Sequence, residues 1–316
     1  MSIKIFIFYI LSVIAMKESL LISSPFVLEI ERKNEVKNIC LDDVFLSKYP
    51  LIVQEMLQKG LFQEAIWYLE ENLLSQNIEI LKKMLEDIMK TKIIKTENLN
   101  KKRLQGATKP RVVDLPNNVK GVLKVNSLHP SSNYKSEVGA YKIDQLFRFS
   151  IVPMTVVTKF NNQLASIQYF VKDTKAASTK NGYQKSIKLN IFDFIIRNKD
   201  RNGENIILLD QREVAIDHGL SLRNRNYLGT FLNLSDSLKE KIFLRYDSVR
   251  FLSSSPKKNP EQFKGEKNLM ERLKKITKEK MIIYLCPLLS EKKVSMIYNR
   301  IQKLFRYIEE TNKTDI

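Results

Sequence analysis

Two oxygen-bearing side chains, Asn205 and Asp217, flank a pair of short apolar segments, and this spacing constrains the fold more than any other feature of the chain. Ile206–Leu209 and Val214–Ile216 have the length and apolar character of β-strands, with the polar segment Asp210–Glu213 as a turn between them. In an antiparallel hairpin, the residue before the first strand lies beside the residue after the second strand. We therefore expect Asn205 and Asp217 to meet at one end of a β-hairpin.

A loop with a further acidic residue precedes this hairpin, and Asp200 and Arg201 lie within it. A carboxylate can accept the proton of an attacking hydroxyl, whereas Asn and Asp supply the hard oxygen ligands that suit Mg²⁺. The set predicts phosphoryl transfer, in which Asp200 orients the hydroxyl while Asn205 and Asp217 hold Mg²⁺ on the nucleotide phosphates. Arg201 is expected either to orient the loop or to contact phosphate.

The alternative is that residues 200–205 form only a turn, since Asp, Asn and Gly are favoured turn residues. A turn does not explain why Asp217, His218 and Gly219 follow a second strand. We therefore favour the functional interpretation of this cluster.

Farther upstream, the alternating segment Gly121–Val125 reads as a strand that carries Lys124. A lysine among apolar neighbours needs a counter-charge, and Glu137, at the start of the next predicted helix, is best placed to supply it. A Lys–Glu ion pair grips the α- and β-phosphates of the nucleotide in kinases. Taken singly, a lysine that reaches water from an edge strand and a glutamate that favours a helix N-terminus are the more ordinary interpretations. The downstream motif, in the right order, favours the ion pair.

The remaining nucleotide contacts are less clearly marked. Gly106 precedes the first strand, where a phosphate-cradling loop is expected, but neither GxGxxG nor GxxxxGK[ST] is present. A polar connector explains this segment equally well. Phe170 and Val171, at the end of the fourth predicted strand, are placed to form a hinge that meets adenine through backbone groups.

The periodicity of the chain predicts an α+β fold. Leu51–Met89 has apolar residues at helical spacing and is broken at Gly60 and at Ser75–Asn77, so we expect two or three amphipathic helices there. Strand, strand, helix, strand and strand follow, which is the order of a kinase small lobe. The predicted strands are Arg111–Asp114, Lys120–Val125, Met154–Phe160 and Leu164–Val171; the helices are Lys135–Phe147, Leu189–Arg197, Asn268–Lys280 and Ser290–Glu310; and Lys90–Lys109 and Asp173–Tyr183 are polar connections.

Composition limits the classes of function. Hydrophobic residues make up 43% of the 316 residues, which is enough for a folded core. The formal net charge is +18; we favour a solvated, lysine-rich surface as its explanation, the alternative being an acidic partner such as a nucleotide or an anionic lipid head group. Without a recognisable nucleic-acid motif, the charge predicts no specific nucleic-acid partner. Cys40 and Cys286 have no metal-ligand spacing, and we expect them to be unbonded, with a disulfide as the alternative in an exported protein.

The first residues have the pattern of a targeting segment. Lys4 is followed by the apolar run Ile5–Ala15, which suits the core of a secretory signal and is short for a membrane span. We predict a signal peptide at residues 1–24, export to the periplasm or outside the cell, and no transmembrane span after the leader is removed. The alternative is a buried strand or core helix at the N-terminus of a cytoplasmic protein.

Two segments, Phe192–Asn205 and Ile216–Gly219, resemble the atypical kinases related to phosphatidylinositol 3-/4-kinases. They are also similar to secretory-pathway kinases of the Four-jointed and Golgi casein kinase group, and more distantly to HipA-like kinases. The resemblance extends over about residues 106–222, and Gly121–Val171 resembles the small lobe of bacterial members. This chain departs from the pattern at Asn202, where the family has His, at His218, where the metal motif has Phe, and in the glycine-rich loop.

The resemblance implies a kinase with an α+β bilobal fold: a helical extension at residues 25–100, a small β-rich lobe at 101–172 and a helical large lobe at 173–316. It implies Lys124 and Glu137 as the ion pair, Asp200 as the catalytic residue, and Asn205 and Asp217 as ligands of Mg²⁺ bound with ATP. A protein serine or threonine is the first choice of acceptor, and an inositol lipid is the second. The alternatives are a pseudokinase that binds nucleotide or a partner without catalysis, and an unrelated α+β adaptor with a chance motif.

Overall fold

The computed structural model describes residues 41, 43–72, 74, 77–98, 110–125, 133–177, 183, 185–198, 200–222 and 267–313, which all belong to one compact unit, Asn38–Ile316. Several predictions fall outside the described residues and stay predictions. These are the signal peptide at residues 1–24, the state of Cys40, and the phosphate loop at Gly106.

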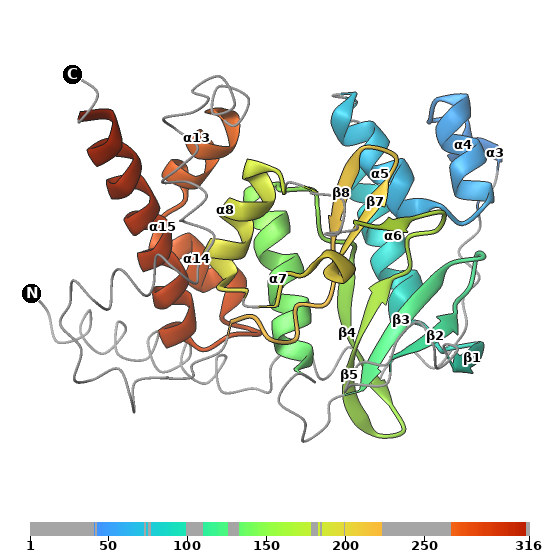
Figure 1. The fold of residues 1–316 in the computed structure, drawn as a ribbon. Helices are drawn as coiled ribbons and strands as arrows, with labels where there is room; N and C mark the ends of the chain where they lie inside the picture. Colours follow the sequence, from blue (N-terminus) through green and yellow to red (C-terminus); the bar gives the residue numbers. More distant parts are fainter. Residues whose placement is uncertain are drawn as a thin grey trace, which may run out of the picture. The chain divides into compact units, whose positions relative to one another are not determined.

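An antiparallel sheet of five strands, in the order β1-β2-β3-β5-β4, carries the first part of the predicted site (Figure 1). Helix α7 lies between β3 and β4 in sequence and packs on β4 and β5. The Asn133 side chain caps α7 by accepting a hydrogen bond from Lys135 N. The predicted order of strand, strand, helix, strand and strand is confirmed, and the elements are β1 Lys95–Asn98, β2 Arg111–Asp114, β3 Lys120–Val125, α7 Tyr134–Phe147, β4 Thr155–Phe160 and β5 Gln163–Tyr169.

Two boundaries in this sheet differ from the prediction. Strand β1 lies inside the predicted polar connector; Lys95 and Thr96 are exposed, so this edge strand has no apolar alternation for a sequence pattern to detect. Strand β5 ends at Tyr169 rather than at Val171. Phe170 continues the ladder with one hydrogen bond, from its amide to Lys120 O (2.9 Å), before the chain leaves the sheet.

The N-terminal helices are those that the apolar spacing predicts: α4 Leu51–Gln58, α5 Phe62–Glu71 and α6 Ile78–Lys90, preceded by the short α3 Asp43–Leu46. Gly60 ends α4 with φ 75°, a left-handed conformation that glycine adopts without a steric penalty. These helices are tied to the sheet by hydrogen bonds as well as by packing. Met154 N donates to Gln63 Oε1 (2.8 Å), and Tyr169 Oη lies 3.0 Å from Gly60 O while its hydroxyl proton is shared with Glu64 Oε2 (2.7 Å).

A second, three-stranded sheet carries the other half of the site. It consists of β6 Lys175–Ala176, β7 Ile206–Leu209 and β8 Arg212–Ala215, and it follows α8 Ile187–Ile196 and the 3₁₀ turn η2 Gly203–Asn205. The predicted hairpin is confirmed, but its turn is Asp210-Gln211 rather than four residues, because Leu209 pairs with Arg212 and Asp210 has φ 54°. The two-residue strand β6 lies in the predicted loop Asp173–Tyr183, where so short an edge strand has no sequence signature.

The C-terminal segment is helical, as predicted, but in three helices. The expected helix Asn268–Lys280 is interrupted, since the Thr277 side chain accepts a hydrogen bond from Lys280 N and caps a new helix. The helices are α13 Lys267–Lys275, α14 Lys278–Leu285 and α15 Glu291–Lys313. In the described part of the chain, no helix has the length and apolar character needed to cross a membrane. Cys286 is a free cysteine.

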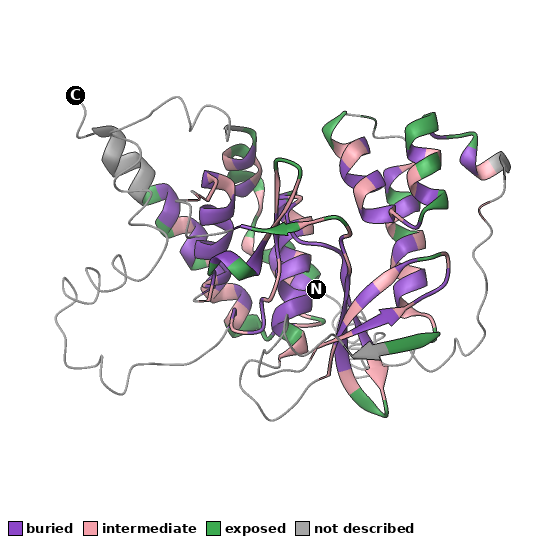
Figure 2. Cartoon of the chain, turned by 45° about the vertical axis from the view of Figure 1, so that its right-hand side comes forward, coloured by how far each residue is buried: buried purple, intermediate pink, exposed green. Residues whose placement is uncertain are grey.

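Buried residues extend from the N-terminal helices through the first sheet to α7, α8 and the C-terminal helices (Figure 2). Helix α8 contacts α7 and α15, and Arg300 Nε donates to Ile195 O (2.7 Å). The α+β class and the kinase-like arrangement, with a β-rich part before a helical part, are confirmed. This packing holds the end of α8, and thus the loop that follows it, close to β3 and α7.

Candidate active site

Lys124 lies at the centre of the predicted site and contacts two carboxylates from different parts of the chain. Its Nζ lies 2.6 Å from Glu137 Oε1 and 2.8 Å from Asp217 Oδ1. Lys124 comes from β3, Glu137 from the first turn of α7, and Asp217 from the residues just after β8. The ion pair predicted from the sequence is therefore present, and it extends to the predicted metal ligand 93 residues away.

The charges in this cluster are buried to different extents. The exposed fraction of the side chain is 12% for Lys124 and 3% for Glu137, but 42% for Asp217. Burial alone would raise the pKa of Glu137, but the Lys124 ammonium outweighs burial and holds that pKa well below its usual value. Burial likewise lowers the pKa of Lys124, whereas Glu137 and Asp217 raise it more, so its net shift is upward. Both groups of the pair are thus charged, and Asp217 is the member that solvent or a ligand can reach.

The hairpin places the two predicted metal ligands together. Ile206 pairs with Ala215 at the open end of the hairpin, and Ile216 N donates to Asn205 O (3.1 Å). Asp217 follows at once with φ 55°, a left-handed conformation that turns the chain out of the strand. Asn205 Nδ2 donates to Asp200 O (2.6 Å), which leaves the amide oxygen of Asn205 as the ligand atom.

Asp200 lies in a loop that is held by its own polar side chains. Asn198 Oδ1 accepts a hydrogen bond from Asp200 N (3.0 Å), and Asn202 Oδ1 accepts from Glu204 N (2.9 Å) and Asn205 N (3.1 Å). Partial burial and the nearby charge of Asp217 raise the pKa of Asp200, while Arg201 opposes this. The hydrogen bond from Asn205 Nδ2 to Asp200 O ties this loop to the end of the hairpin that carries Asp217.

The Arg201 side chain faces the protein interior rather than a substrate. Its Nη1 donates to Asn205 O (2.7 Å) and to Ile216 O (2.6 Å), and its Nη2 lies 3.1 Å from Asp193 Oδ1. The exposed fraction of the Arg201 side chain is only 2%. Of the two roles expected for Arg201, the geometry supports orientation of the loop, because one guanidinium holds the backbone carbonyls of Asn205 and of Ile216, the residue before Asp217.

Asp193 and Lys185 also position this loop, although the sequence reasoning did not single them out. Asp193 lies in α8, is 1% exposed, and accepts hydrogen bonds from Arg201 and from Asn198 Nδ2. Lys185 Nζ donates to Arg201 O (2.8 Å). An aspartate inside the apolar helix α8 was a usable signal for Asp193, since a buried carboxylate needs a cationic partner.

His218 occupies a closed apolar environment next to the ion pair. It is 0% exposed, its ring lies edge-on to Phe192 at 5.9 Å, and neither ring nitrogen has a hydrogen-bond partner among the residues that the structure describes. Burial lowers the pKa of His218, which favours the neutral ring. Its backbone amide donates to Glu137 Oε2 (2.9 Å), whereas Nδ1 lies 3.7 Å from that oxygen, beyond hydrogen-bond distance. A neutral His218 thus packs as an aromatic residue, in the position where the resembling kinases have Phe.

The donor set fits Mg²⁺ better than a transition metal. Asn205 and Asp217 offer an amide and a carboxylate oxygen, which are ligands for a hard cation that keeps several waters. Nowhere among the described residues do three histidine, cysteine or acidic side chains gather as a metal site.

Phe170 and Val171, the residues expected to form the adenine-binding hinge, follow the end of β5. Phe170 is half-buried and its backbone amide is hydrogen-bonded to Lys120 O, and Val171 is buried. The hinge role of these two residues stays a prediction.

No protein-family model and no curated protein matches this sequence. Among solved structures, the chain is similar to a crystal structure of the Golgi casein kinase, with 17% identity and a TM-score of 0.40, over 74% of this chain and 75% of that chain. It is also similar to the Golgi casein kinase with Mn/ADP bound, with 14% identity and a TM-score of 0.40, over 88% of this chain and 93% of that chain. The function proposed below is based on the geometry of the site itself.

Proposed function

We propose that this protein binds Mg²⁺ and ATP between its first sheet and the β7–β8 hairpin, and transfers the γ-phosphate to a hydroxyl acceptor. The observation that supports this most strongly is Lys124, whose Nζ bridges Glu137 and Asp217. One lysine thereby joins a strand, the helix after it and a hairpin that carries two oxygen ligands. A purely structural salt bridge does not require the half-exposed carboxylate and the neighbouring amide oxygen.

Each side chain has a role that follows from its environment. Glu137 keeps Lys124 charged and oriented, so that the ammonium can bind phosphate oxygens. Asn205 and Asp217 would hold Mg²⁺, which supplies positive charge to the phosphates when it is bound. Asp200 accepts the proton of the acceptor hydroxyl. The hydroxyl oxygen of the acceptor bonds to the γ-phosphorus as the bond between that phosphorus and the leaving ADP breaks. The raised pKa of Asp200 makes it a stronger proton acceptor than an ordinary aspartate.

Among hydroxyl acceptors, we propose a protein serine or threonine first and an inositol lipid second. The resemblance of Phe192–Asn205 to secretory-pathway kinases supports the protein acceptor, and the net charge of +18 supports attraction to an anionic lipid surface. Parallel assays on a protein mixture and on lipid vesicles distinguish the two.

The test is transfer of radiolabelled phosphate from γ-labelled ATP, with Asp200→Asn as the variant and Glu271→Gln as the matched control. Glu271 is exposed on α13 and lies outside the site, so its amide replacement repeats the change in charge without touching the chemistry. We expect Asp200→Asn to lower transfer at least about 100-fold, with nucleotide binding retained, and Glu271→Gln to match the unsubstituted protein.

Nucleotide binding without transfer to any acceptor, including the protein itself, would favour the pseudokinase. The absence of a recognisable glycine-rich loop in the sequence is the feature that keeps this second function in view. Binding of neither ATP nor ADP in the presence of Mg²⁺ would reject both.

A further inference from the structure

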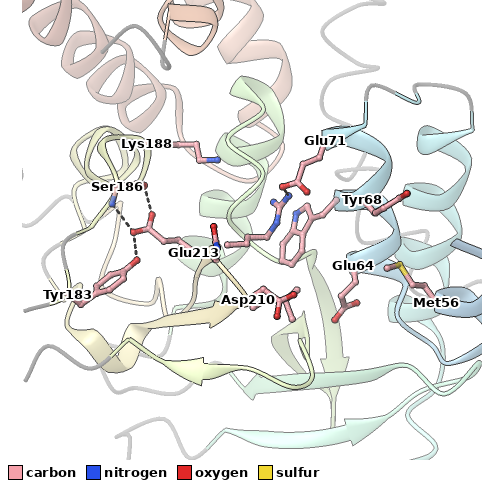
Figure 3. A pocket seen from close by; sticks show the side chains of 13 residues that line it. Met56, Glu64, Tyr68, Glu71, Tyr183, Ser186, Lys188, Asp210 and Glu213 are labelled. Carbon is pink, nitrogen blue, oxygen red and sulfur yellow. Dashed lines mark hydrogen bonds and ion pairs between the residues drawn. The ribbon is translucent and has the colours of Figure 1, made fainter. Parts of the chain in front are cut away.

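A pocket of about 830 Å³ lies away from the proposed nucleotide site, at the other end of the β7–β8 hairpin. Figure 3 shows side chains of α4 and α5 on one side, residues 183–188 on the other, and the hairpin turn between them. Asn205 and Asp217 flank the opposite end of the same hairpin. A four-residue strand spans about 13 Å, so the pocket and the metal ligands are separate sites. The lining residues are Met56, Glu64, Trp67, Tyr68, Glu71, Tyr183, Ser186, Lys188, Leu209, Asp210, Gln211, Arg212 and Glu213.

The pocket has an acidic excess in a basic protein. Four carboxylates line it, against the two cations Lys188 and Arg212, whereas the whole chain has a formal net charge of +18. Two of these carboxylates are already engaged. Glu71 pairs with Arg212, and Glu213 accepts hydrogen bonds from Tyr183 Oη and from the amide and hydroxyl of Ser186.

Glu64 differs from these two because half of its carboxylate has no partner. Glu64 Oε2 accepts a hydrogen bond from Tyr169 Oη (2.7 Å), but Oε1 is shielded from water and makes no hydrogen bond with any described residue. Burial raises the pKa of Glu64, although the Tyr169 hydroxyl, the nearby backbone amides of Glu64 and Lys172, and the charge of Lys172 act in the opposite direction. A positive charge brought into the pocket would compensate for this desolvation.

The other walls suit a cation that is attached to an apolar stem. Tyr68 and Tyr183 contribute aromatic rings, and Met56 and Leu209 contribute aliphatic surface. The Trp67 ring is already covered by the Arg212 guanidinium, 4.8 Å from the ring centroid, so it shows how this wall accommodates an organic cation rather than offering a free face. Aromatic faces attract organic cations, whereas nowhere in the described part of the chain do three acidic, histidine or cysteine side chains gather around an inorganic ion. We propose that this pocket binds an organic cation, a primary ammonium or guanidinium group on an aliphatic chain, with Glu64 as its counter-ion. The cation comes either from a free amine or from a lysine or arginine side chain of a peptide.

Trp67 is the single tryptophan of the chain and lines the pocket, so its fluorescence reports directly on occupancy. We would titrate the full-length protein with 1,6-diaminohexane and, as the neutral probe of matched length, with 1,6-hexanediol. The diamine is expected to change the Trp67 emission saturably, and the diol is not. Equal responses to both probes would overturn the proposal, because the binding would then not require a charge.

Glu64→Gln is the decisive variant, since the amide oxygen can still accept the Tyr169 hydrogen bond while the charge is lost. We expect diamine affinity to fall at least tenfold in Glu64→Gln and to stay unchanged in Glu271→Gln, measured by fluorescence and by calorimetry. An unchanged affinity in Glu64→Gln overturns the proposal. If Glu64→Gln does not fold, Tyr68→Leu removes the half-buried aromatic ring instead, and the same tenfold loss is required.

Two further experiments are needed. The first distinguishes a free amine from a peptide side chain as the source of the cation, and the second tests whether the pocket is separate from the proposed nucleotide site. Blocked tripeptides Gly-Lys-Gly and Gly-Arg-Gly, compared with Gly-norleucine-Gly, are expected to bind more tightly than the diamine if a peptide is the ligand, and more weakly if a free amine is. Saturating ADP with Mg²⁺ should leave the diamine titration unchanged, and competition between them would reject a separate site. This inference does not depend on the proposed kinase function, because the fluorescence titration is read without nucleotide.

Discussion

Lys124 makes two ion pairs with carboxylates of very unequal exposure, and this inequality is the clearest functional signal at the level of single residues. Glu137 is closed off and permanently needs a partner, whereas Asp217 is open enough to exchange its contact with the lysine for a metal ion. A fixed partner and an exchangeable partner on one ammonium suit a site that binds and releases a charged ligand.

Replacing Lys124 should affect Glu137 and Asp217 differently. Lys124→Met leaves Glu137 as an unpaired buried charge, so we expect it to lower the free energy of unfolding by roughly 3 kcal/mol and to abolish nucleotide binding. The double variant Lys124→Met/Glu137→Gln has no unpaired charge and should recover most of the stability but none of the binding. The native protein, the single variants Lys124→Met and Glu137→Gln, and the double variant form a double-mutant cycle. Urea denaturation of these four proteins measures stability, and nucleotide titration measures binding. Additive losses of stability would show that the two residues are not coupled.

A second buried carboxylate, Asp144 in α7, gives a prediction on pH. Asp144 is 1% exposed and accepts hydrogen bonds from Ile151 N (2.9 Å) and Val152 N (3.1 Å), and burial raises its pKa to about 7. Because the folded state then holds this proton more tightly than the unfolded state, ionisation of Asp144 reduces stability as the pH rises from about 4 to about 7. Above about pH 7, the contribution of Asp144 to the free energy of unfolding no longer changes with pH.

Asp144→Asn keeps the accepting oxygen and removes the titration. The difference in unfolding free energy between the native protein and this variant should fall by about 1 kcal/mol per pH unit between pH 5 and 6.5. Comparing the two proteins cancels other groups that titrate in this interval, such as His218. A difference that is independent of pH would mean that Asp144 is ionised throughout.

At the level of elements, Arg201 joins the loop that carries Asp200 to the β7–β8 hairpin. It donates to the carbonyls of Asn205 and Ile216 while its other nitrogens contact Asp193 of α8. A planar guanidinium can make these contacts in three directions at once, and an ammonium cannot. The spacing of Asn205 and Asp217, the two proposed metal ligands, is therefore set by a residue whose contacts are with their backbone neighbourhood rather than with their side chains.

Arg201→Lys should increase the Mg²⁺ concentration needed for half-maximal phosphate transfer by about tenfold, since second-shell changes typically cost 10–100-fold in metal affinity. Arg272→Lys is the matched control: Arg272 donates to Phe147 O and Arg148 O from α13, outside the site. Both variants should lose some stability, but only Arg201→Lys should change the Mg²⁺ dependence. An identical Mg²⁺ dependence in both would reduce Arg201 to a purely structural residue.

Elements with a strong apolar period could be predicted from the sequence, and weakly patterned ones could not. Strands β2 and β3 and helix α7 have the expected bounds to within one residue, and β3 also shows the alternating burial that its sequence predicts. Strand β1 is polar, with Lys95 and Thr96 exposed, and β6 has only two residues, so each is defined by its partner strand rather than by its own sequence. The break at Thr277 depends on a side-chain cap within a continuous amphipathic pattern.

The residues of the candidate site that lie in sequence motifs could be predicted, and those that act through tertiary packing could not. Lys124, Glu137 and Asp217 were predicted from the order of motifs, whereas antiparallel strand geometry accounts only for the meeting of Asn205 and Asp217 at one end of the β7–β8 hairpin. The ion pair between Asp193 and Arg201 depends on how α8 packs against the loop after it. The pocket beside Glu64 depends in the same way on which helices face the hairpin turn. That information lies in tertiary packing, which periodicity does not contain.

Across the whole described unit, the N-terminal helices and the first sheet share one core. Gly60 lies at a close approach between them: a Cβ added there would lie 2.6 Å from Asn118 O and 2.8 Å from Asn117 O, in the turn between β2 and β3. The helices are therefore expected to unfold together with the sheet rather than as a separate domain.

Gly60→Ala tests this connection, because it combines a left-handed backbone angle with a clash against backbone oxygens. We expect it to lower the unfolding free energy by about 2 kcal/mol or more in a single cooperative transition. Gly139→Ala is the contrast, since its Cβ would meet the flexible end of Leu222 and alanine favours the helix, so its effect should be small. Separate transitions for the helices and the sheet would contradict the shared core.

The most direct test of the proposed site is calorimetric binding of ADP in the presence and absence of Mg²⁺, with the native protein and with Asp217→Asn. If Lys124, Asn205 and Asp217 share one nucleotide, the native protein binds ADP at least about tenfold more tightly with Mg²⁺ than without it, and Asp217→Asn loses that difference. An ADP affinity that is the same in both proteins, with and without Mg²⁺, would contradict the account.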